Sequence, residues 1–152
     1  MNRNSRLRAA LVGGTIAGTL DILFALSFAA ANGVPPVRLL QTVASGLLGE
    51  AAYSGGLPAA ALGLAGHFGM SYLWAASFVV IAVRLPRLTL RPIVAGAIFG
   101  VFVFFAMRLV VLPLSAFPHP VTFKPLSAGL DLLSHMFLFG VPIALAAARR
   151  KE

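Results

Sequence analysis

The sequence contains no cysteine, and it contains few acidic residues. Without thiols the chain forms no disulfide framework, thiolate metal site or iron–sulfur cluster. Asp and Glu together number 4 in 152 residues, against 12 Lys and Arg, and 11% of the residues are charged. The motifs of common enzyme chemistry are missing too, because no P-loop, dinucleotide fingerprint, zincin motif or nucleophile elbow is present. These absences favour a binding or structural role over an enzymatic one, and we assign no catalytic residue.

What the chain has instead is long apolar runs. Hydrophobic residues make up 59% of the sequence, and its mean hydropathy is +0.94, far above that of an ordinary soluble domain. Four runs are long enough to cross a hydrocarbon core about 30 Å thick; they cover residues 9–31, 58–83, 92–112 and 126–148. The sequence therefore predicts a single all-α integral membrane domain over residues 1–152, with four transmembrane helices in the lipid bilayer.

Residues 37–52, between the first two runs, have a different pattern. Apolar residues recur there at helical spacing, but polar residues such as Arg38 and Glu50 separate them. The segment is too short and too polar to span a membrane, so we expect an external amphipathic or re-entrant helix. The proline-rich residues 113–125 predict an irregular loop on the same side of the membrane.

The basic residues are distributed unevenly around the apolar runs. Nine of the 12 lie at the N-terminus, between the second and third runs, or at the C-terminus, whereas Arg38 and Lys124 fall on the other side. By the positive-inside rule, this distribution predicts that both termini are cytoplasmic. The net charge of +8 is therefore a topology signal, and we expect no nucleic-acid partner.

The two halves of the chain are weakly similar. Residues 12–18 align with residues 94–100 through shared Val, Gly and Ile, and residues 60–67 align with residues 128–135 through shared Ala, Leu and His. One interpretation is a two-helix repeat, with parallel halves related by an axis along the membrane normal. The other is chance similarity between low-complexity apolar sequences.

Five ionisable residues fall inside the predicted helices, where such groups are costly and face protein or water. At 1.5 Å per residue, Asp21, His67 and His135 each lie about 13 to 15 Å from the outer helix end, near the midplane. Arg108 and Asp131 share a shallower level, about 6 to 8 Å deep. We expect the first three to bind a ligand or a proton, or else to form a packed hydrogen-bonded group. We expect the last two to form a structural ion pair, or an anion site at Arg108 that Asp131 gates.

The two histidines could also hold a cofactor. His67 and His135, opposed at one depth, could be the axial ligands of a b-type haem, or with Asp21 could bind a divalent metal such as iron or zinc. The simpler alternative is a neutral histidine pair that is hydrogen-bonded to its neighbours. Outside the helices, Glu50 and His119 are either solvated side chains or residues at the mouth of an external pocket.

Six short motifs are spread along most of the chain: Gly18-x-x-Asp21, Ala44-Ser45-Gly46-Leu47-Leu48-Gly49, Gly55-Gly56, Ala61-Leu62-Gly63-x-x-x-His67, Pro113-Leu114-Ser115-Ala116 and Ser134-His135. In this order they resemble a family of small, uncharacterised bacterial inner-membrane proteins with four predicted helices, a domain of unknown function. The resemblance implies a location in the bacterial cytoplasmic membrane. It implies no activity.

Three hypotheses for the function follow. The leading one is a transport-associated membrane protein that binds a proton, a metal ion or a small polar ligand at Asp21, His67 and His135. The second is a redox protein that holds haem between the two histidines. The third is a structural or assembly subunit of a larger membrane complex, packed through glycine seams such as Gly14-x-x-x-Gly18. Four helices are few for alternating access, so transport would require a homodimer.

Overall fold

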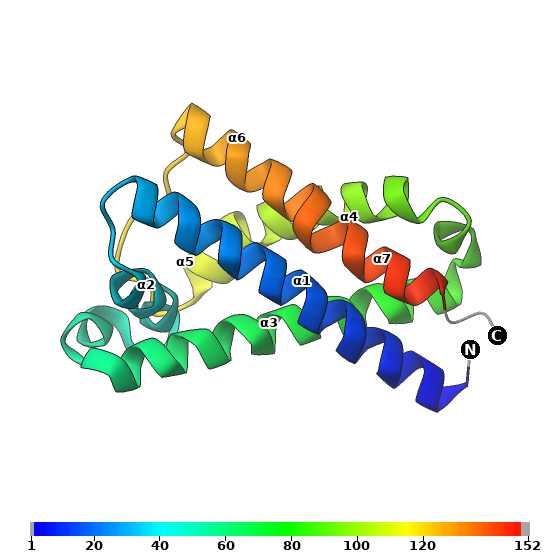
Figure 1. Ribbon diagram of the computed structural model, residues 1–152, viewed down its shortest axis with the longest axis horizontal. Coiled ribbons are helices and arrows are strands. Elements are labelled where there is room, and N and C mark those ends of the chain that lie inside the picture. The colour runs from blue at the N-terminus through cyan, green and yellow to red at the C-terminus, as the bar shows by residue number, and fades with distance from the viewer. Residues whose placement is uncertain (1, 150–152) are drawn as a thin grey trace.

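The computed structural model describes residues 2–149, and all regular secondary structure in this range is helical. Four helical segments are long and apolar enough to cross a membrane (Figure 1). They are α1 (Arg3–Ala31), α3 (Gly56–Arg84), Pro92–Leu114 and Pro125–Ala148. The prediction of an all-α protein with four such helices is confirmed.

The third and fourth spans each contain a π-helical segment that the sequence analysis did not predict. The segments are α4 (Pro92–Ala106), η3 (Met107–Val111) and α5 (Leu112–Leu114) in the third span, and α6 (Pro125–Ser134), η4 (His135–Gly140) and α7 (Val141–Ala148) in the fourth. The two π-helical segments, η3 and η4, end two residues before Pro113 and Pro142 respectively. Proline lacks an N–H and its ring clashes with the carbonyl four residues earlier, so a wider preceding turn relieves both problems.

The first helix begins before the apolar run that predicts it. Asn2 is the N-cap of α1, and its side chain accepts a hydrogen bond of 2.8 Å from the backbone N–H of Ser5. The basic first turns are therefore helical and continue the span beyond its apolar part.

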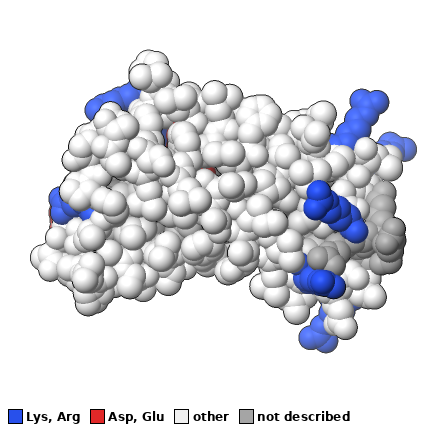
Figure 2. Space-filling model, in the orientation of Figure 1, with Lys and Arg blue, Asp and Glu red and all other residues white. Residues whose placement is uncertain are grey.

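The connections lie at two opposite ends of the bundle (Figure 1). One end, which we call the termini end, holds the start of α1, the end of α7 and η2 (Pro86–Thr89). The other, the loop end, holds α2 (Pro36–Leu48), η1 (Gly49–Ser54) and the loop of residues 115–124. Figure 2 shows Lys and Arg side chains at both ends of the visible face, and the band between them exposes almost no charged atoms. Such a band is the surface that lipid requires.

The half of the bundle nearer the termini end is closely packed. Its core contains Phe78 of α3, Phe99 of α4 and Ile143 of α7, all buried. Glycines allow the helices to approach: a Cβ on Gly96 would lie 2.6 Å from the backbone oxygen of Gly140. In the other half the helices separate into two groups, because α3 packs mainly on α1 and α2, whereas α4 packs mainly on η4 and α7.

Candidate functional site

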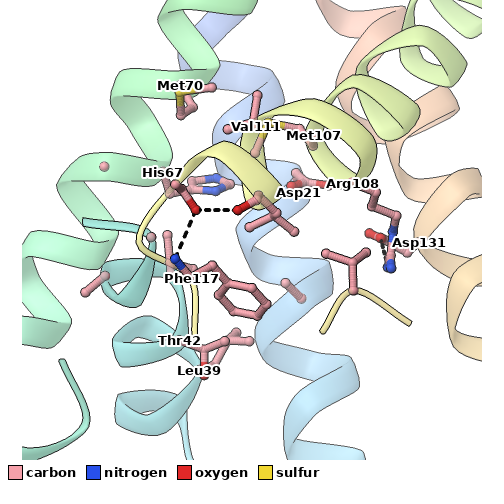
Figure 3. Close-up of a pocket in the computed structure, with 18 of the residues that line it drawn as sticks. Asp21, Leu39, Thr42, His67, Met70, Met107, Arg108, Val111, Phe117 and Asp131 are labelled. Atoms are coloured by element: carbon pink, nitrogen blue, oxygen red, sulfur yellow. Dashed lines mark hydrogen bonds and ion pairs between the residues drawn. The ribbon is translucent and has the colours of Figure 1, made fainter. Parts of the chain in front are cut away.

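A cavity of about 720 Å³ lies between these two groups of helices, in the half nearer the loop end (Figure 3). It is lined by all five ionisable residues singled out from the sequence: Asp21, His67, Arg108, Asp131 and His135. In the view of Figure 3, Asp21 lies between His67 on one side and the Arg108–Asp131 pair on the other. Most of the remaining wall is apolar. The structure thus brings together residues from α1, α3, η3, α6 and η4 around one space.

Arg108 and Asp131, the residues for which we expected an ion pair, are in direct contact. Arg108 Nη2 donates to Asp131 Oδ2 at 2.7 Å, and Nη1 donates to the backbone oxygen of Thr122 at 3.0 Å. The guanidinium carbon lies 4.8 Å from the ring centre of Phe104 and 5.4 Å from that of Phe123. Arg108 therefore fastens η3 to α6 and to the loop, and these interactions occupy the face and the two ends of its guanidinium.

Asp131 also interacts with His135, one turn later in the same span. His135 Nδ1 lies 3.2 Å from Asp131 Oδ1 and 2.9 Å from the Asp131 backbone oxygen. On the neighbouring helix, Asp21 Oδ1 accepts a hydrogen bond of 2.9 Å from Ser134 Oγ, and Asp21 is close enough to His135 for their charges to interact. The two depth levels inferred from the sequence are therefore connected through Asp131 and His135.

His67 is held differently. Its Nε2 lies 2.8 Å from the backbone oxygen of Gly18, and since a carbonyl only accepts, Nε2 is the donor and carries the proton. A histidine ligates a metal through an unprotonated nitrogen, so His67 as placed offers Nδ1. Within residues 2–149, no three His, Asp or Glu side chains are placed to hold a metal ion. This geometry lends no support to the alternative of a haem or divalent-metal site at His67 and His135.

The two candidates for an external pocket, Glu50 and His119, do not line the cavity. Glu50 is exposed on η1. His119 Nε2 lies 3.1 Å from the hydroxyl oxygen of Tyr53, and the guanidinium of Arg38 lies 3.9 Å from the centre of the Tyr53 ring. These contacts connect the loop to α2 and η1 on the outside of the site.

Several lining residues were not identified from the sequence, and two glycines are the most informative of them. Gly66 and Gly69 of α3 line the cavity on either side of His67, and a Cβ on either would meet nothing within 4 Å. Gly63, by contrast, contacts the backbone of Leu40. In the sequence, the available signal was the presence of three glycines, Gly63, Gly66 and Gly69, close to His67. Packing against α2 explains Gly63, whereas no packing contact explains the other two.

Comparison of the chain with protein-family models, with curated proteins and with solved structures found no match.

The site combines polar groups with an apolar wall, and it ends inside the bundle. On the side of the cavity toward the termini end, Ser71 Oγ donates to the backbone oxygen of Gly14 at 2.7 Å, and both residues are buried. Beyond them lies the apolar core around Phe78. The cavity is therefore suited to hold a ligand with a polar group and an apolar body, and the closely packed core separates it from the termini end.

Proposed function

We propose that this protein is a multi-pass protein of the bacterial inner membrane that binds a small ligand in the cavity, as the binding step of a transport process. In this proposal both termini are cytoplasmic, and the cavity lies in the outer half of the membrane. The grouping of Arg3, Arg6, Arg8, Arg84 and Arg87 at the termini end supports this orientation.

The observation that carries the proposal is that one cavity of about 720 Å³ collects all five of the ionisable residues. Ionisable groups in a membrane are costly and commonly mark a ligand or ion pathway. The volume falls within the range of sites for small molecules. A purely structural cluster would gain most from close packing, but Gly66 and Gly69 leave the space beside His67 open.

Transport requires a second conformation in which the closely packed half opens. The glycine contacts between α4 and the last span, such as that of Gly96 with Gly140, would have to separate or slide in that step. Four helices offer few surfaces for such a movement, so we propose that the transporting unit is a homodimer.

The experiment fills the cavity with a larger side chain and tests which small molecules then no longer co-purify with the protein. Gly66→Leu places a side chain in open cavity space, and Gly129→Leu is the matched control, because Gly129 is exposed on α6, lies outside the cavity and also has nothing within 4 Å. Each variant is purified from membranes in mild detergent, and the small molecules extracted from it are compared by mass spectrometry.

We expect at least one compound to accompany the wild type and Gly129→Leu and to be depleted from Gly66→Leu. If the three preparations carry the same compounds in the same amounts, the cavity is not a binding site.

A further inference from the structure

Counted without the two histidines, the charges that line the cavity do not balance. Arg108 and Asp131 neutralise each other at 2.7 Å, and His135 uses Nδ1 to contact Asp131. Asp21 is a second carboxylate in the same cavity, and within residues 2–149 it forms no ion pair. Its hydrogen bond comes from the neutral hydroxyl of Ser134. The cavity therefore contains one more acidic than permanently basic group.

The guanidinium of Arg108 already binds a carboxylate, that of Asp131. Nη1 and Nη2 already donate to Thr122 and Asp131, and Nε is buried from solvent without a partner in the described chain. An anionic ligand would have to share the charge of this guanidinium with Asp131 while lying in the same cavity as a second carboxylate, Asp21. The arrangement favours a ligand of the opposite charge.

The walls around Asp21 select the kind of cation. The cavity lining includes the aromatic ring of Phe117 and the thioethers of Met70 and Met107, and Figure 3 shows these three side chains around the space beside His67. Aromatic faces attract cations, and thioethers adapt to irregular apolar shapes. A strongly hydrated ion would have to give up its water shell in this largely apolar cavity, and few polar groups there could replace the water. A cation that carries its own apolar groups has a smaller desolvation cost.

We propose that the cavity takes a hydrophobic organic cation, such as a substituted ammonium or phosphonium ion, whose charge lies against Asp21 and whose apolar groups contact the walls. This inference rests on the proposed function, since it names the ligand class of the same cavity. Asp21 is the binding residue. His67 is a positioning residue, because its bond to the Gly18 carbonyl fixes α3 against α1 one turn before Asp21.

The test uses three probes of similar shape and different charge, titrated into the purified full-length protein by calorimetry. Tetraphenylphosphonium is the cation, tetraphenylborate the anion and triphenylphosphine oxide the neutral probe. We expect the wild type to bind the cation at least about tenfold more tightly than the anion, because Coulomb energies at a few ångström exceed the value of one decade in affinity. Weaker or equal binding of the cation, or none, overturns the inference.

Two variants locate the charge that is responsible. Asp21→Asn is expected to weaken tetraphenylphosphonium binding about tenfold or more and to leave triphenylphosphine oxide within about twofold, which shows that the cavity has not collapsed. Glu50→Gln removes a carboxylate outside the cavity and is expected to change neither affinity. If Asp21→Asn binds tetraphenylphosphonium as tightly as the wild type does, the role of Asp21 is wrong.

Gly66→Leu separates this inference from the proposed function. If both are right, it weakens binding of the cationic and the neutral probe, whereas Gly129→Leu weakens neither. If it weakens the neutral probe while the wild type prefers the anion, the cavity is a binding site but not one for cations. If it alters no probe's affinity, binding occurs elsewhere and the proposed function fails with the inference.

Discussion

At the scale of single residues, Asp131 is the acceptor that organises the polar side of the cavity. One carboxylate oxygen accepts from Arg108 at 2.7 Å, and the other lies 3.2 Å from His135. The Asp131 side chain is 32% exposed and that of Arg108 is 21% exposed, so both groups are largely removed from solvent. Removing either partner leaves a charge in a region where rehydration is difficult, and this cost exceeds the net value of the pair.

The first prediction concerns this ion pair. Asp131→Asn and Arg108→Gln should each lower the stability of the purified protein. The loss of stability in the double variant should be smaller than the sum of the losses in the two single variants. We expect a coupling free energy of about 1.5–3 kcal/mol, which is the range for hydrogen bonds to charged groups. Strictly additive losses would show that the pair contributes nothing of its own.

The second prediction concerns His67. His67→Phe keeps an aromatic ring but removes the donor to Gly18, and we expect it to destabilise the protein by about 1 kcal/mol. His67→Gln keeps an N–H at a similar distance from the backbone, so it should recover part of the loss. The readouts are the melting temperature and the affinity for tetraphenylphosphonium. If His67→Phe and His67→Gln have the same melting temperature and the same affinity, the hydrogen bond to Gly18 does not position His67 or α3.

At the scale of elements, apolar length and proline position were enough to predict the four spans. They were not enough to predict the π-helical segments, since a helix can accommodate an internal proline by a kink as well as by a π-helical turn. Which solution forms depends on the neighbouring helix: Gly100 lies against the backbone of His135, the first residue of η4. That close approach depends on tertiary packing, and no local pattern in the sequence specifies it.

The candidate site was predictable to the same degree. A fixed rise per residue placed Asp21, His67 and His135 at one depth, and all three line the cavity. The cavity itself was not predictable, because it results from the divergence of α3 and α4 and from the missing side chains at Gly66 and Gly69.

The third prediction tests the packing of the elements. Gly96→Ala would place a Cβ 2.6 Å from the Gly140 oxygen and from Val141 Cα, so backbone must move, and we expect a loss of about 1–3 kcal/mol. Gly129→Ala makes the same change on an exposed face of α6 with nothing nearby. It should be neutral or stabilising by up to about 1 kcal/mol, because Ala favours the helix. Unfolding of both variants in denaturant measures the difference, and equal stabilities would contradict the close α4–α7 contact.

At the scale of the whole molecule, the bundle divides into a closely packed half and an open one. The packed half has an apolar core of Phe and Ala residues together with glycine contacts between helices, whereas the open half has the cavity and the ionisable residues. The loop of residues 115–124 covers the open half and is joined to α2, because Ala116 N–H donates to the Gly46 oxygen at 2.9 Å. The cavity is therefore separate from the apolar core of the packed half.

The last prediction concerns the direction in which this asymmetric molecule is inserted. The chain has no cysteine, so a single introduced thiol reports its own position without any background. Ser54→Cys and Lys124→Cys lie at exposed positions of the loop end, and Leu90→Cys lies at an exposed position of the termini end. With cytoplasmic termini, a membrane-impermeant maleimide should label the first two in intact cells and should label Leu90→Cys only after permeabilisation. The reverse pattern would place the cavity in the cytoplasmic half of the membrane, and its ligand would then be drawn from inside the cell.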